Sequence, residues 1–587
     1  MCGVIFVHSK KKPLRKELCH QALNSLDHRG PDYKLNFEEE TNLFFGQTVL
    51  SITGKPDEKL KVFNHSRSKK YFLLFNGEIY NYQDIKKKYQ INELATNTDT
   101  EILVNLFEKE NLKNIPNVIE GMYAYLCYDK RKRKIYVSRD IIGEKCLYKY
   151  ETEEILVISS EIKTILEFIE KPKINYYEFY KYFFSRHFLT DKNSFFENIS
   201  IISPGVTLEY SIDHMQWKTI LKKDLSSFID PNIIENNKFR SKDDLIDELD
   251  SLFINNARML DPGYKFASVF SGGVDSSLSS IYMNSVNNKC EFYALSFGLK
   301  DQVAKQLNIF ENVINKKISV KEVTNYTFLK AILESYDKTL IPFATHSFVS
   351  QNILTKIIKE NDLRVLIGGD GADELFGGYE IYKNIDFNDA YYNPSPYSGY
   401  VNNHITFSNF DAVRYKEMNR EVWEGTKKFF PSDNGSDSVI QRVLYLDTKL
   451  QLESVGLRSS DLMSMLNSVE SRGFYITSNI IKFAINLPAK YKINLSEENE
   501  RMKTKPLLKY LFIRKFGEKL LFDKQGFSGF PNESGKIILK NQFNLFESYF
   551  DTNPRNYSLK DNQALEWKVI NVELFLKTLY EKNIITT

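Results

Sequence analysis

The sequence predicts a protein of two parts, a mixed α+β domain followed by an α/β domain built on a parallel sheet. The chain has 587 residues, which exceeds the usual domain length of ~100–200 residues. The first part alternates short β-rich runs with turns. The second part alternates short apolar strands with longer helical stretches, a pattern typical of a parallel sheet covered by helices.

The composition excludes several classes of protein. Hydrophobic residues make up 42% and aromatic residues 14% of the chain, so buried cores can form and disorder is not the main state. The 79 Lys and Arg nearly balance the 76 Asp and Glu, which gives no bulk sign of a nucleic-acid-binding protein. No run of ~18 apolar residues occurs, so we expect no membrane-spanning helix.

The cysteines and the N-terminus indicate a reducing compartment. The five cysteines are widely spaced and form no CxxC pair, which argues against a disulfide framework and a zinc site. The apolar stretch at the N-terminus is too short for a signal peptide, and its charges follow it instead of preceding it. We therefore expect a cytoplasmic enzyme that acts on small molecules.

The first domain is expected over residues 1–210, with a polar linker over 211–240 and the second domain over 241–587. Helical patterns lie near Arg15–Leu26 and Thr100–Phe107, and Thr98–Glu101 supplies a capping-type start for the second of these. The expected strands of the first domain are Gly3–Val7, Asn42–Phe45, Tyr71–Phe75, Met122–Tyr128, Lys134–Ser138 and Ile155–Ser159.

The second domain begins with three short apolar runs that predict parallel strands. These are Lys265–Phe270, Phe292–Phe297 and Arg364–Ile367, and a helix is expected from about Val274. The stretch Asn384–Ser408 is rich in Asn, Tyr, Pro and Ser and is interpreted as a long loop or insertion.

Cys2 is the first candidate catalytic residue. If Met1 is removed, the thiol and the α-amine lie on the same residue. The reference pKa of an α-amine is about 7.7–8.0. The amine can therefore take the thiol proton directly or through a water molecule, and so replace the usual histidine base. A cysteine can also stand at position 2 by chance, so the prediction depends on the motifs that follow.

Two polar motifs and a carboxylate downstream support this prediction. His28–Asp32 (HRGPD) is a rigid polar turn after a helix, and Asn76–Asn81 (NGEIYN) follows an apolar run. Asn76 beside Gly77 at a strand end suits the presentation of a side-chain amide and a backbone N–H to a developing oxyanion. Asp99 supplies a carboxylate suited to holding a substrate ammonium group.

A Ser/Gly-rich segment between a strand and a helix predicts a phosphate site. The backbone N–H groups of such a turn, with a helix N-terminus behind them, form an anion cradle to which serine hydroxyls add donors. The carboxylate of Asp275 beside the phosphates indicates a bound magnesium ion. No Gly-Lys-Ser/Thr element follows, so this is not the loop of phosphate-transferring NTPases. The segment is Ser271, Gly272, Gly273, Val274, Asp275, Ser276 and Ser277.

A second Gly-rich segment, Gly368–Tyr379 (GGDGADELFGGY), follows the expected strand Arg364–Ile367. Its glycines permit close approach of the backbone to a ligand, and its acidic residues suit metal binding and proton transfer.

At this point the sequence resembles a known family. The Met-Cys-Gly start, the HRGPD and NGEIYN motifs and the segment Arg139–Gly143 look like class II glutamine amidotransferases. Ser271–Ser277 resembles the pyrophosphate loop of ATP pyrophosphatases, and Gly368–Tyr379 resembles the acidic motif of glutamine-hydrolysing asparagine synthetases. The resemblance extends from Cys2 to about Pro531. It implies an N-terminal Ntn-type αββα sandwich followed by an α/β parallel-sheet synthetase domain with extra helices.

The resemblance implies roles for single residues in the first domain. Cys2 attacks the glutamine amide and releases ammonia. Asn76 and Gly77 form the oxyanion hole, and together with Glu78 and Asp99 they bind glutamine.

In the second domain the resemblance assigns the ATP site. Asp275 and Asp373 hold magnesium pyrophosphate, and Asp370 takes the place of an acidic residue that handles protons at the ammonia step. In the run KTKPLLK, Lys505 rather than Lys503 matches a lysine at the α-phosphate or the leaving pyrophosphate, where it neutralises developing charge. Further ATP contacts fall on Val269, Phe297, Gly368 and Gly369.

Some positions depart from the family pattern. Val49 stands where the family has an arginine that grips the glutamine α-carboxylate, and a valine cannot make that contact. Arg29 is a candidate to replace it; otherwise glutamine binding is weak. Gly473–Ile476 differs from the usual Pro-Phe-Leu-Asp, and Lys524–Phe527 is a weaker match. We hypothesise that glutaminase activity is retained.

The resemblance implies an ATP- and Mg²⁺-dependent amidotransferase. Ammonia from glutamine passes internally to an acyl-adenylate made from ATP and a carboxylate, most simply aspartate, which gives asparagine, AMP and pyrophosphate. One alternative is amidation of another carboxylate, such as a uronic acid of a surface polysaccharide. A second is a non-catalytic regulator that binds nucleotide or glutamine. Expected partners are small molecules, with neither nucleic acid nor membrane, and family relatives are often homodimers.

Overall fold

The computed structural model describes residues 1–38, 40–52, 64–184, 193–298, 300–343, 345–385, 412–430, 435–522, 544–550 and 563–585. The chain divides into two compact units. Unit 1 consists of Met1–Asn175, Lys192–Ser227 and Ser464–Glu470, and unit 2 consists of Tyr176–Asp191, Phe228–Met463 and Ser471–Thr587. Most of the insertion expected at Asn384–Ser408 and the whole Lys524–Phe527 match lie outside the described residues.

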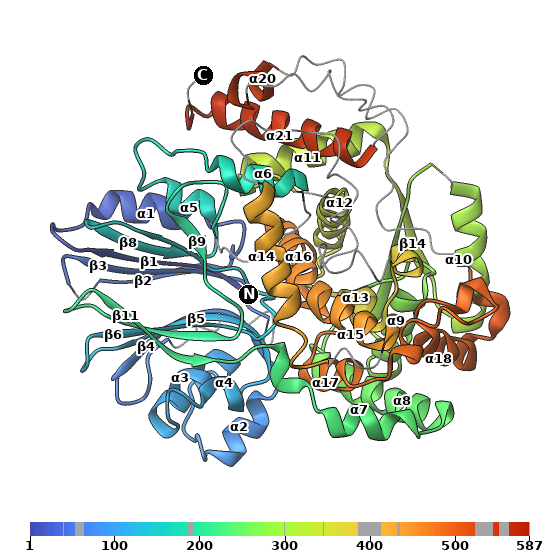
Figure 1. The fold of residues 1–587 in the computed structure, drawn as a ribbon. Helices are drawn as coiled ribbons and strands as arrows, with labels where there is room; N and C mark the ends of the chain where they lie inside the picture. The colour runs from blue at the N-terminus through green and yellow to red at the C-terminus, as the bar shows by residue number, and fades with distance from the viewer. Residues whose placement is uncertain are drawn as a thin grey trace. The chain divides into compact units, whose positions relative to one another are not determined.

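Unit 1 contains two antiparallel sheets, which form its layered centre (Figure 1). The first has strand order β2-β3-β1-β8-β7-β9, and the second has the order β11-β10-β6-β5-β4. The strands are β1 (Cys2–Ser9), β2 (Tyr33–Phe37), β3 (Leu43–Val49), β4 (Tyr71–Ile79), β5 (Gly121–Asp129), β6 (Lys134–Arg139), β7 (Tyr148–Glu151), β8 (Ile155–Ser159), β9 (Ile199–Ile201), β10 (Val206–Ser211) and β11 (Gln216–Lys222).

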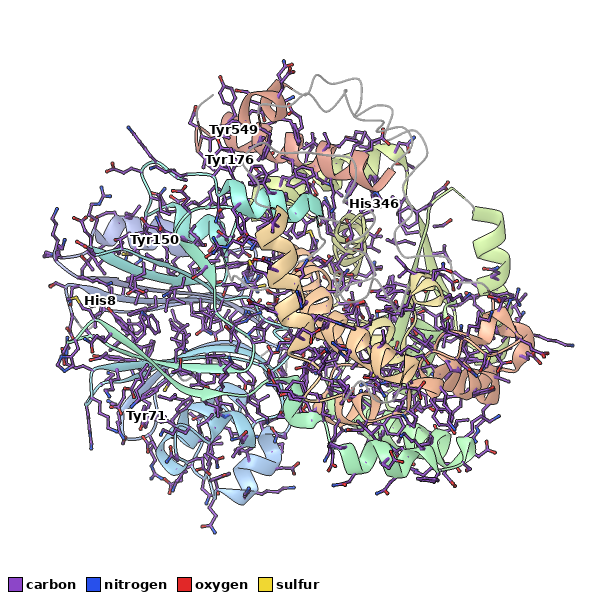
Figure 2. All side chains as sticks on the ribbon, viewed as in Figure 1. His8, Tyr71, Tyr150, Tyr176, His346 and Tyr549 are labelled. Carbon is purple, nitrogen blue, oxygen red and sulfur yellow. The ribbon has the colours of Figure 1, made fainter. Side chains whose placement is uncertain are left out.

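Side chains that alternate along the strands bind these layers together. On β4, Phe72 and Leu74 belong to a core shared by both sheets. Their neighbours Tyr71 and Leu73 face the other way and pack with residues of α3, as expected for a period of two. In Figure 2 the labelled His8 lies between the sheets, whereas Tyr71 lies on the helix side of the second sheet.

Helices cover the outer faces of both sheets. In Figure 1, α1 and α5 lie over the first sheet, and α2, α3 and α4 lie under the second. The helices are α1 (Lys16–Asn24), α2 (Tyr82–Lys88), α3 (Asp99–Lys109), α4 (Ile115–Val118) and α5 (Ile162–Leu166). The N-cap Thr98 accepts a hydrogen bond from the N–H of Glu101, as its sequence predicts. The expected αββα sandwich is therefore confirmed.

Unit 2 is built on a five-stranded sheet of order β14-β13-β12-β15-β16. The pairs β12–β13, β13–β14 and β12–β15 run parallel, and α9 and α12 contact the sheet. The predicted α/β class is confirmed. The strands are β12 (Phe266–Val269), β13 (Cys290–Ser296), β14 (Ile318–Glu322), β15 (Val365–Gly368) and β16 (Glu470–Gly473).

Helices make up most of the rest of unit 2. Between α15 and α16 the helix is wound as a π-helix, η5 (Asp447–Leu457). The α-helices are α6 (Tyr176–Phe184), α7 (Pro231–Lys238), α8 (Lys242–Leu260), α9 (Val274–Val286), α10 (Lys300–Ile314), α11 (Asn325–Thr339), α12 (Ser347–Glu360), α13 (Ala372–Phe376), α14 (Ala412–Glu424), α15 (Ser436–Leu446), α16 (Arg458–Leu466), α17 (Ser478–Ile485), α18 (Pro506–Phe516), α20 (Asn544–Phe550) and α21 (Gln563–Glu581).

The order of the strands positions the site of unit 2. Strands β12 and β15 are parallel neighbours, with Ser268 opposite Ile367. The carboxyl ends of parallel neighbours meet at the same edge of a sheet, which is where α/β proteins bind ligands. The two Gly-rich segments of the sequence, which follow β12 and β15, therefore lie side by side. Within the described part of the chain, no helix is both long and apolar enough to cross a membrane.

Candidate active sites

Cys2 begins strand β1, and it is buried. Its backbone N–H donates to Asn76 Oδ1 at 3.1 Å, and its carbonyl accepts from the Arg29 guanidinium at 3.2 Å. The Gln47 side-chain amide donates to its Sγ at 3.1 Å. Burial raises the pKa of the thiol, while the N-terminal amine and the Gln47 hydrogen bond act in the opposite sense. Three separate segments of unit 1 therefore hold this residue.

Asn76 and Gly77 lie in β4, beside Cys2. Asn76 is fully buried, and its Nδ2 has no hydrogen-bond partner among the described residues. A buried donor without a partner costs about 1–3 kcal/mol, so an atom of a ligand that accepts this hydrogen bond would be stabilised. A methyl group at Gly77 would overlap the carbonyl oxygen of Met122, which makes glycine necessary at this point of the strand.

Two carboxylates lie near the amine end of β1. Asp99 Oδ2 accepts from the N–H of Ile79 at 3.1 Å and its Oδ1 from the N–H of Thr100 at 2.7 Å. Burial nevertheless raises the pKa of Asp99 to about 6. Burial works to lower the pKa of the Met1 amine, but nearby groups, Glu78 and Asp99 among them, raise it. Glu78 and Asp99 are thus close enough to attract a cation at this place.

The HRGPD turn packs onto β3 at Gly30, where a methyl group would overlap the backbone around Val49. Next to it, Arg29 is fully buried with a guanidinium nitrogen 3.1 Å from Glu161 Oε1. Its Nε donates to the Cys2 carbonyl. The guanidinium therefore pairs with groups of the chain itself. Arg29 is not placed to bind a glutamine α-carboxylate in the way expected of an arginine at position 49.

Unit 2 contains a cavity of about 730 Å³ where β12 and β15 end. Most of the predicted synthetase residues line it. Among the described residues, Gly272, Ser277 and Phe297 do not line it, and Ser277 is fully buried in α9. The predicted residues that line the cavity are Val269, Ser271, Gly273, Val274, Asp275, Ser276, Gly368, Gly369, Asp370, Asp373 and Lys505.

The Ser/Gly loop joins β12 to the N-terminus of α9. Gly272 has φ +80° and Gly273 is the N-cap of α9, so the loop turns sharply at glycine, which tolerates that backbone conformation. The hydroxyl of Ser276 accepts from the N–H of Ser271 at 3.1 Å, and the two hydroxyls are 2.8 Å apart. These bonds close the loop on itself and present the start of α9 to the cavity, as expected for an anion cradle.

Asp370 follows β15 and lies in the cavity wall. Ser460 Oγ donates to its Oδ2 at 3.2 Å. Burial raises the pKa of Asp370 to about 6, against the effect of that hydrogen bond. The next residue, Gly371, has φ +87°, and it begins the turn that places Asp373 on the first turn of α13. A carboxylate with this pKa can exchange a proton near neutral pH.

Lys505 joins the two Gly-rich segments. Its Nζ is 2.5 Å from Asp275 Oδ2 and 2.6 Å from Asp373 Oδ1, and its side chain is 4% exposed. Burial acts to lower the pKa of Lys505, but the two carboxylates outweigh it and raise the pKa above its usual value. A methyl group at Gly378 would overlap the Lys505 side chain. Lys503, by contrast, pairs with Glu500.

Both sites contain other polar residues that were not predicted from the sequence. Gln47 contacts the Cys2 sulfur. In the cavity wall, Tyr379 donates to Glu374 Oε1 at 2.6 Å, and burial raises the pKa of Glu374 to about 8. Gln451 on the π-helix lines the cavity, and its buried Oε1 has no hydrogen-bond partner within the described part of the chain. Glu374 and Tyr379 lie inside a recognised motif, whereas no pattern marks the two glutamines.

Two family models match the chain. The glutamine amidotransferase domain matches residues 1–220, and asparagine synthase matches residues 256–560, which is more than half of the chain. The chain belongs to the asparagine synthase family. It is a glutamine-dependent ligase, an asparagine-synthetase-like amidotransferase, and its asparagine synthase domain implies the use of ATP.

Relatives match over most of the chain at low identity. A putative glutamine-hydrolysing asparagine synthetase of Methanocaldococcus jannaschii is 24% identical, covering 86% of this chain and 85% of that protein. Asparagine synthetase 1 of Bacillus subtilis is 25% identical, with 84% and 82% covered. Among solved structures, a glutamine phosphoribosylpyrophosphate amidotransferase from B. subtilis covers 50% of this chain and 65% of that chain. Its sequence identity of 14% and TM-score of 0.27 are too low to support an argument.

Proposed function

We propose that this family member forms an amide in two half-reactions. Glutamine is hydrolysed at Cys2 in unit 1, and a carboxylate is adenylated by ATP in the cavity of unit 2. Ammonia from the first reaction then displaces AMP from the acyl-adenylate. The observation that carries the proposal is the convergence of Asp275, Asp373 and Lys505, from three distant segments, in one cavity at the ends of parallel strands.

In the glutamine half-reaction, the Cys2 thiolate attacks the side-chain amide carbon of glutamine. Removal of Met1 would expose the Cys2 α-amine as the base that takes the thiol proton and passes it to the leaving ammonia. The unpartnered Nδ2 of Asn76 is the donor proposed for the oxyanion, with the Gly77 N–H beside it. Asp99 and Glu78 are proposed to hold the glutamine ammonium group. Water then hydrolyses the thioester to glutamate.

The proposed oxyanion contact predicts the behaviour of Asn76→Ala. We expect kcat for glutamine hydrolysis to fall about 10²–10³-fold, because one donor to the developing oxyanion is lost. Glutamate release measures this rate. Amide synthesis with ammonia as the nitrogen source is the internal control and should stay at the wild-type rate. An unchanged kcat in a folded variant would remove Asn76 from the oxyanion hole.

The cavity of unit 2 fits magnesium pyrophosphate. Asp275 Oδ1 is buried and has no hydrogen-bond partner among the residues described, as expected of an oxygen that binds a cation, and Asp373 is the second proposed ligand. A bound Mg²⁺ would neutralise charge on the phosphates. The N–H groups at the start of α9 bind the phosphates, and Lys505 neutralises the oxygen that leaves with pyrophosphate. Asp370 takes the proton of the attacking ammonia.

The last role predicts a pH dependence for Asp370. Its pKa is raised from 3.8 to about 6, so the ionised form that accepts a proton is lost as the pH falls through 6. We expect ammonia-dependent synthesis, expressed per unprotonated ammonia, to fall below pH 6 in the wild type. Asp370→Asn should lower the rate about 10²-fold and abolish this fall in rate at low pH, the acidic limb of the pH–rate profile. ATP–pyrophosphate exchange should persist.

A second variant sharpens the test. Ser460→Ala removes the hydrogen bond that lowers the pKa of Asp370, so the acidic limb should move to higher pH. The assignment would be disproved by an acidic limb that is identical in wild type, Asp370→Asn and Ser460→Ala.

Aspartate is the first acceptor proposed, since the relatives carry the name asparagine synthetase. A second candidate is a hydroxylated carboxylate such as a uronic acid. It is favoured by the uncharged polar groups of the cavity wall, among which the unpartnered amide oxygen of Gln451 would accept from a ligand hydroxyl or ammonium group. Hydroxyl and amide side chains accompany it in the cavity wall, namely Thr345, Ser347, Gln351, Ser459 and Ser460.

ATP–pyrophosphate exchange across a panel of carboxylates separates these acceptors. Exchange that depends on aspartate supports asparagine synthesis, and exchange that depends only on a uronic acid supports the second candidate. No exchange with any member of a broad panel would contradict adenylation in this cavity.

A further inference from the structure

Gln47 of strand β3 holds the Cys2 sulfur, although no pattern in the sequence marks it. It is fully buried. Its Nε2 donates to Cys2 Sγ at 3.1 Å and to the Phe75 carbonyl at 3.0 Å. Its Oε1 accepts from Asn64 Nδ2 at 3.0 Å and from the Phe75 N–H at 3.2 Å. Both the NH₂ group and the oxygen of this amide therefore make two hydrogen bonds each.

These partners decide which end of the amide faces the sulfur. If the amide were flipped, its NH₂ group would face the N–H groups of Asn64 and Phe75, and its oxygen would face the Phe75 carbonyl. In the flipped amide, donors would therefore face donors and an acceptor would face an acceptor. The NH₂ end therefore points at Cys2, with one N–H directed at the sulfur.

An N–H that points at a sulfur favours its ionised form. The charged groups that act on the thiol and the adjoining amine are Asp99, Glu78, Glu470 and the amine itself, and the Arg29 guanidinium lies on the Cys2 carbonyl. Gln47 is uncharged, so its contribution is the same at every pH. It also restrains the rotation of the Cys2 side chain next to Asn76, the proposed oxyanion donor.

We propose that Gln47 is a catalytic residue of the glutamine half-reaction, because its N–H orients the Cys2 sulfur and stabilises it as the thiolate. The thiolate forms the C–S bond as the glutamine amide C–N bond breaks, and the thiol proton leaves with ammonia. When water cleaves the thioester, the sulfur is again a thiolate and accepts the same N–H. The role in glutamine hydrolysis rests on the proposed function, whereas the effect on the thiol belongs to the protein alone.

The test compares Gln47→Leu with wild type and with the matched control Thr48→Val. Thr48 is a buried neighbour on the same strand, and its hydroxyl bonds to Leu26 and Gly3 rather than to the sulfur. The rate of Cys2 alkylation by iodoacetamide is measured against pH and read on the Cys2 peptide by mass spectrometry. All five cysteines are buried, so only a reading at that peptide reports on Cys2.

We expect Gln47→Leu to raise the apparent pKa of Cys2 by about 1–2 pH units, which is the loss of one hydrogen bond to a charged group. Its kcat for glutamine hydrolysis at pH 7 should fall about 10–100-fold and recover as the pH rises, while KM stays within about threefold. Thr48→Val should keep the wild-type pKa. Gln47→Glu places a carboxylate at the sulfur and should raise the pKa further than leucine does.

The inference is overturned if folded Gln47→Leu, with a wild-type melting temperature, keeps the wild-type alkylation pKa. It is equally overturned if Thr48→Val shifts that pKa as much, since the effect would then be general damage to β3. Failure of the proposed function gives a different result. In that case wild-type protein releases no glutamate from glutamine, while the alkylation pKa still responds to Gln47.

Discussion

Replacing Lys505 by methionine is expected to abolish ATP–pyrophosphate exchange and to leave glutamine hydrolysis at the wild-type rate. The Lys505 ammonium lies within 2.6 Å of both Asp275 and Asp373, where the charge of the leaving pyrophosphate would develop. Loss of one such electrostatic contact typically costs 10²–10³-fold in rate. Methionine keeps much of the buried side-chain volume, so the change removes the charge with little loss of packing.

The matched control for this variant is Lys503→Met. Lys503 lies two residues away in the same KTKPLLK run, but it pairs with Glu500 and does not line the cavity. We expect Lys503→Met to keep exchange within about twofold of wild type. Lys505→Arg should recover little activity. It keeps the charge, but its planar guanidinium does not fit where a point charge lies between two carboxylates beside Gly378.

Removal of Lys505 also leaves two partly buried carboxylates without their cation, which destabilises a protein. Normal glutamine hydrolysis shows that unit 1 is folded, but it says nothing of unit 2. Thermal unfolding, monitored at several wavelengths, is therefore also measured to show that unit 2 is folded. Exchange at the wild-type rate in folded Lys505→Met would contradict the assignment of the cavity as the adenylation site. Equal losses in Lys505→Met and Lys503→Met would show that the run acts only through structure.

The apolar strands were predictable because their own residues determine them. The run Tyr71–Phe75 alternates between two cores, and this demands an extended chain whatever its neighbours are. Strands such as β11 could not be found in the same way. Its side chains are mostly polar and exposed, and it is defined by pairing with β10. Strand β7 (Tyr148–Glu151) likewise depends on its partners β8 and β9.

The residues of the candidate sites divide in the same way, into those that a local motif marks and those that it does not. Asp275, Asp373 and Lys505 were selected from local motifs, and a motif carries its own turn chemistry, as at Gly272 and Gly371. What the sequence could not show is which distant groups complete each site. The pairing of Arg29 with Glu161 depends on where α5 begins, and Asp370 meets Ser460 only through the packing of α16. Such contacts join residues about 90 or more positions apart, which no local pattern encodes.

The second large effect is expected for Cys2→Ala, which should abolish glutamine-dependent amide synthesis and spare synthesis from ammonia. The variant removes the only atom proposed to attack glutamine, so the loss should reach the limit of detection, below about 10⁻³ of the wild-type rate. Ammonia enters the second half-reaction directly, and unit 2 has its own core and its own cavity. Both rates are read in one assay as amide product formed with either nitrogen source.

Two further variants make the Cys2 result specific. Cys19→Ala changes another buried cysteine of unit 1, on α1, where burial raises the pKa of the thiol to about 12. It should keep both activities, because such a thiol stays protonated and unreactive. Cys2→Ser keeps the hydrogen-bond geometry with Gln47 but not the nucleophilicity of sulfur, so it should behave like Cys2→Ala. Loss of ammonia-dependent synthesis in Cys2→Ala would contradict two separate sites, whereas glutamine use that survives would place the nucleophile elsewhere.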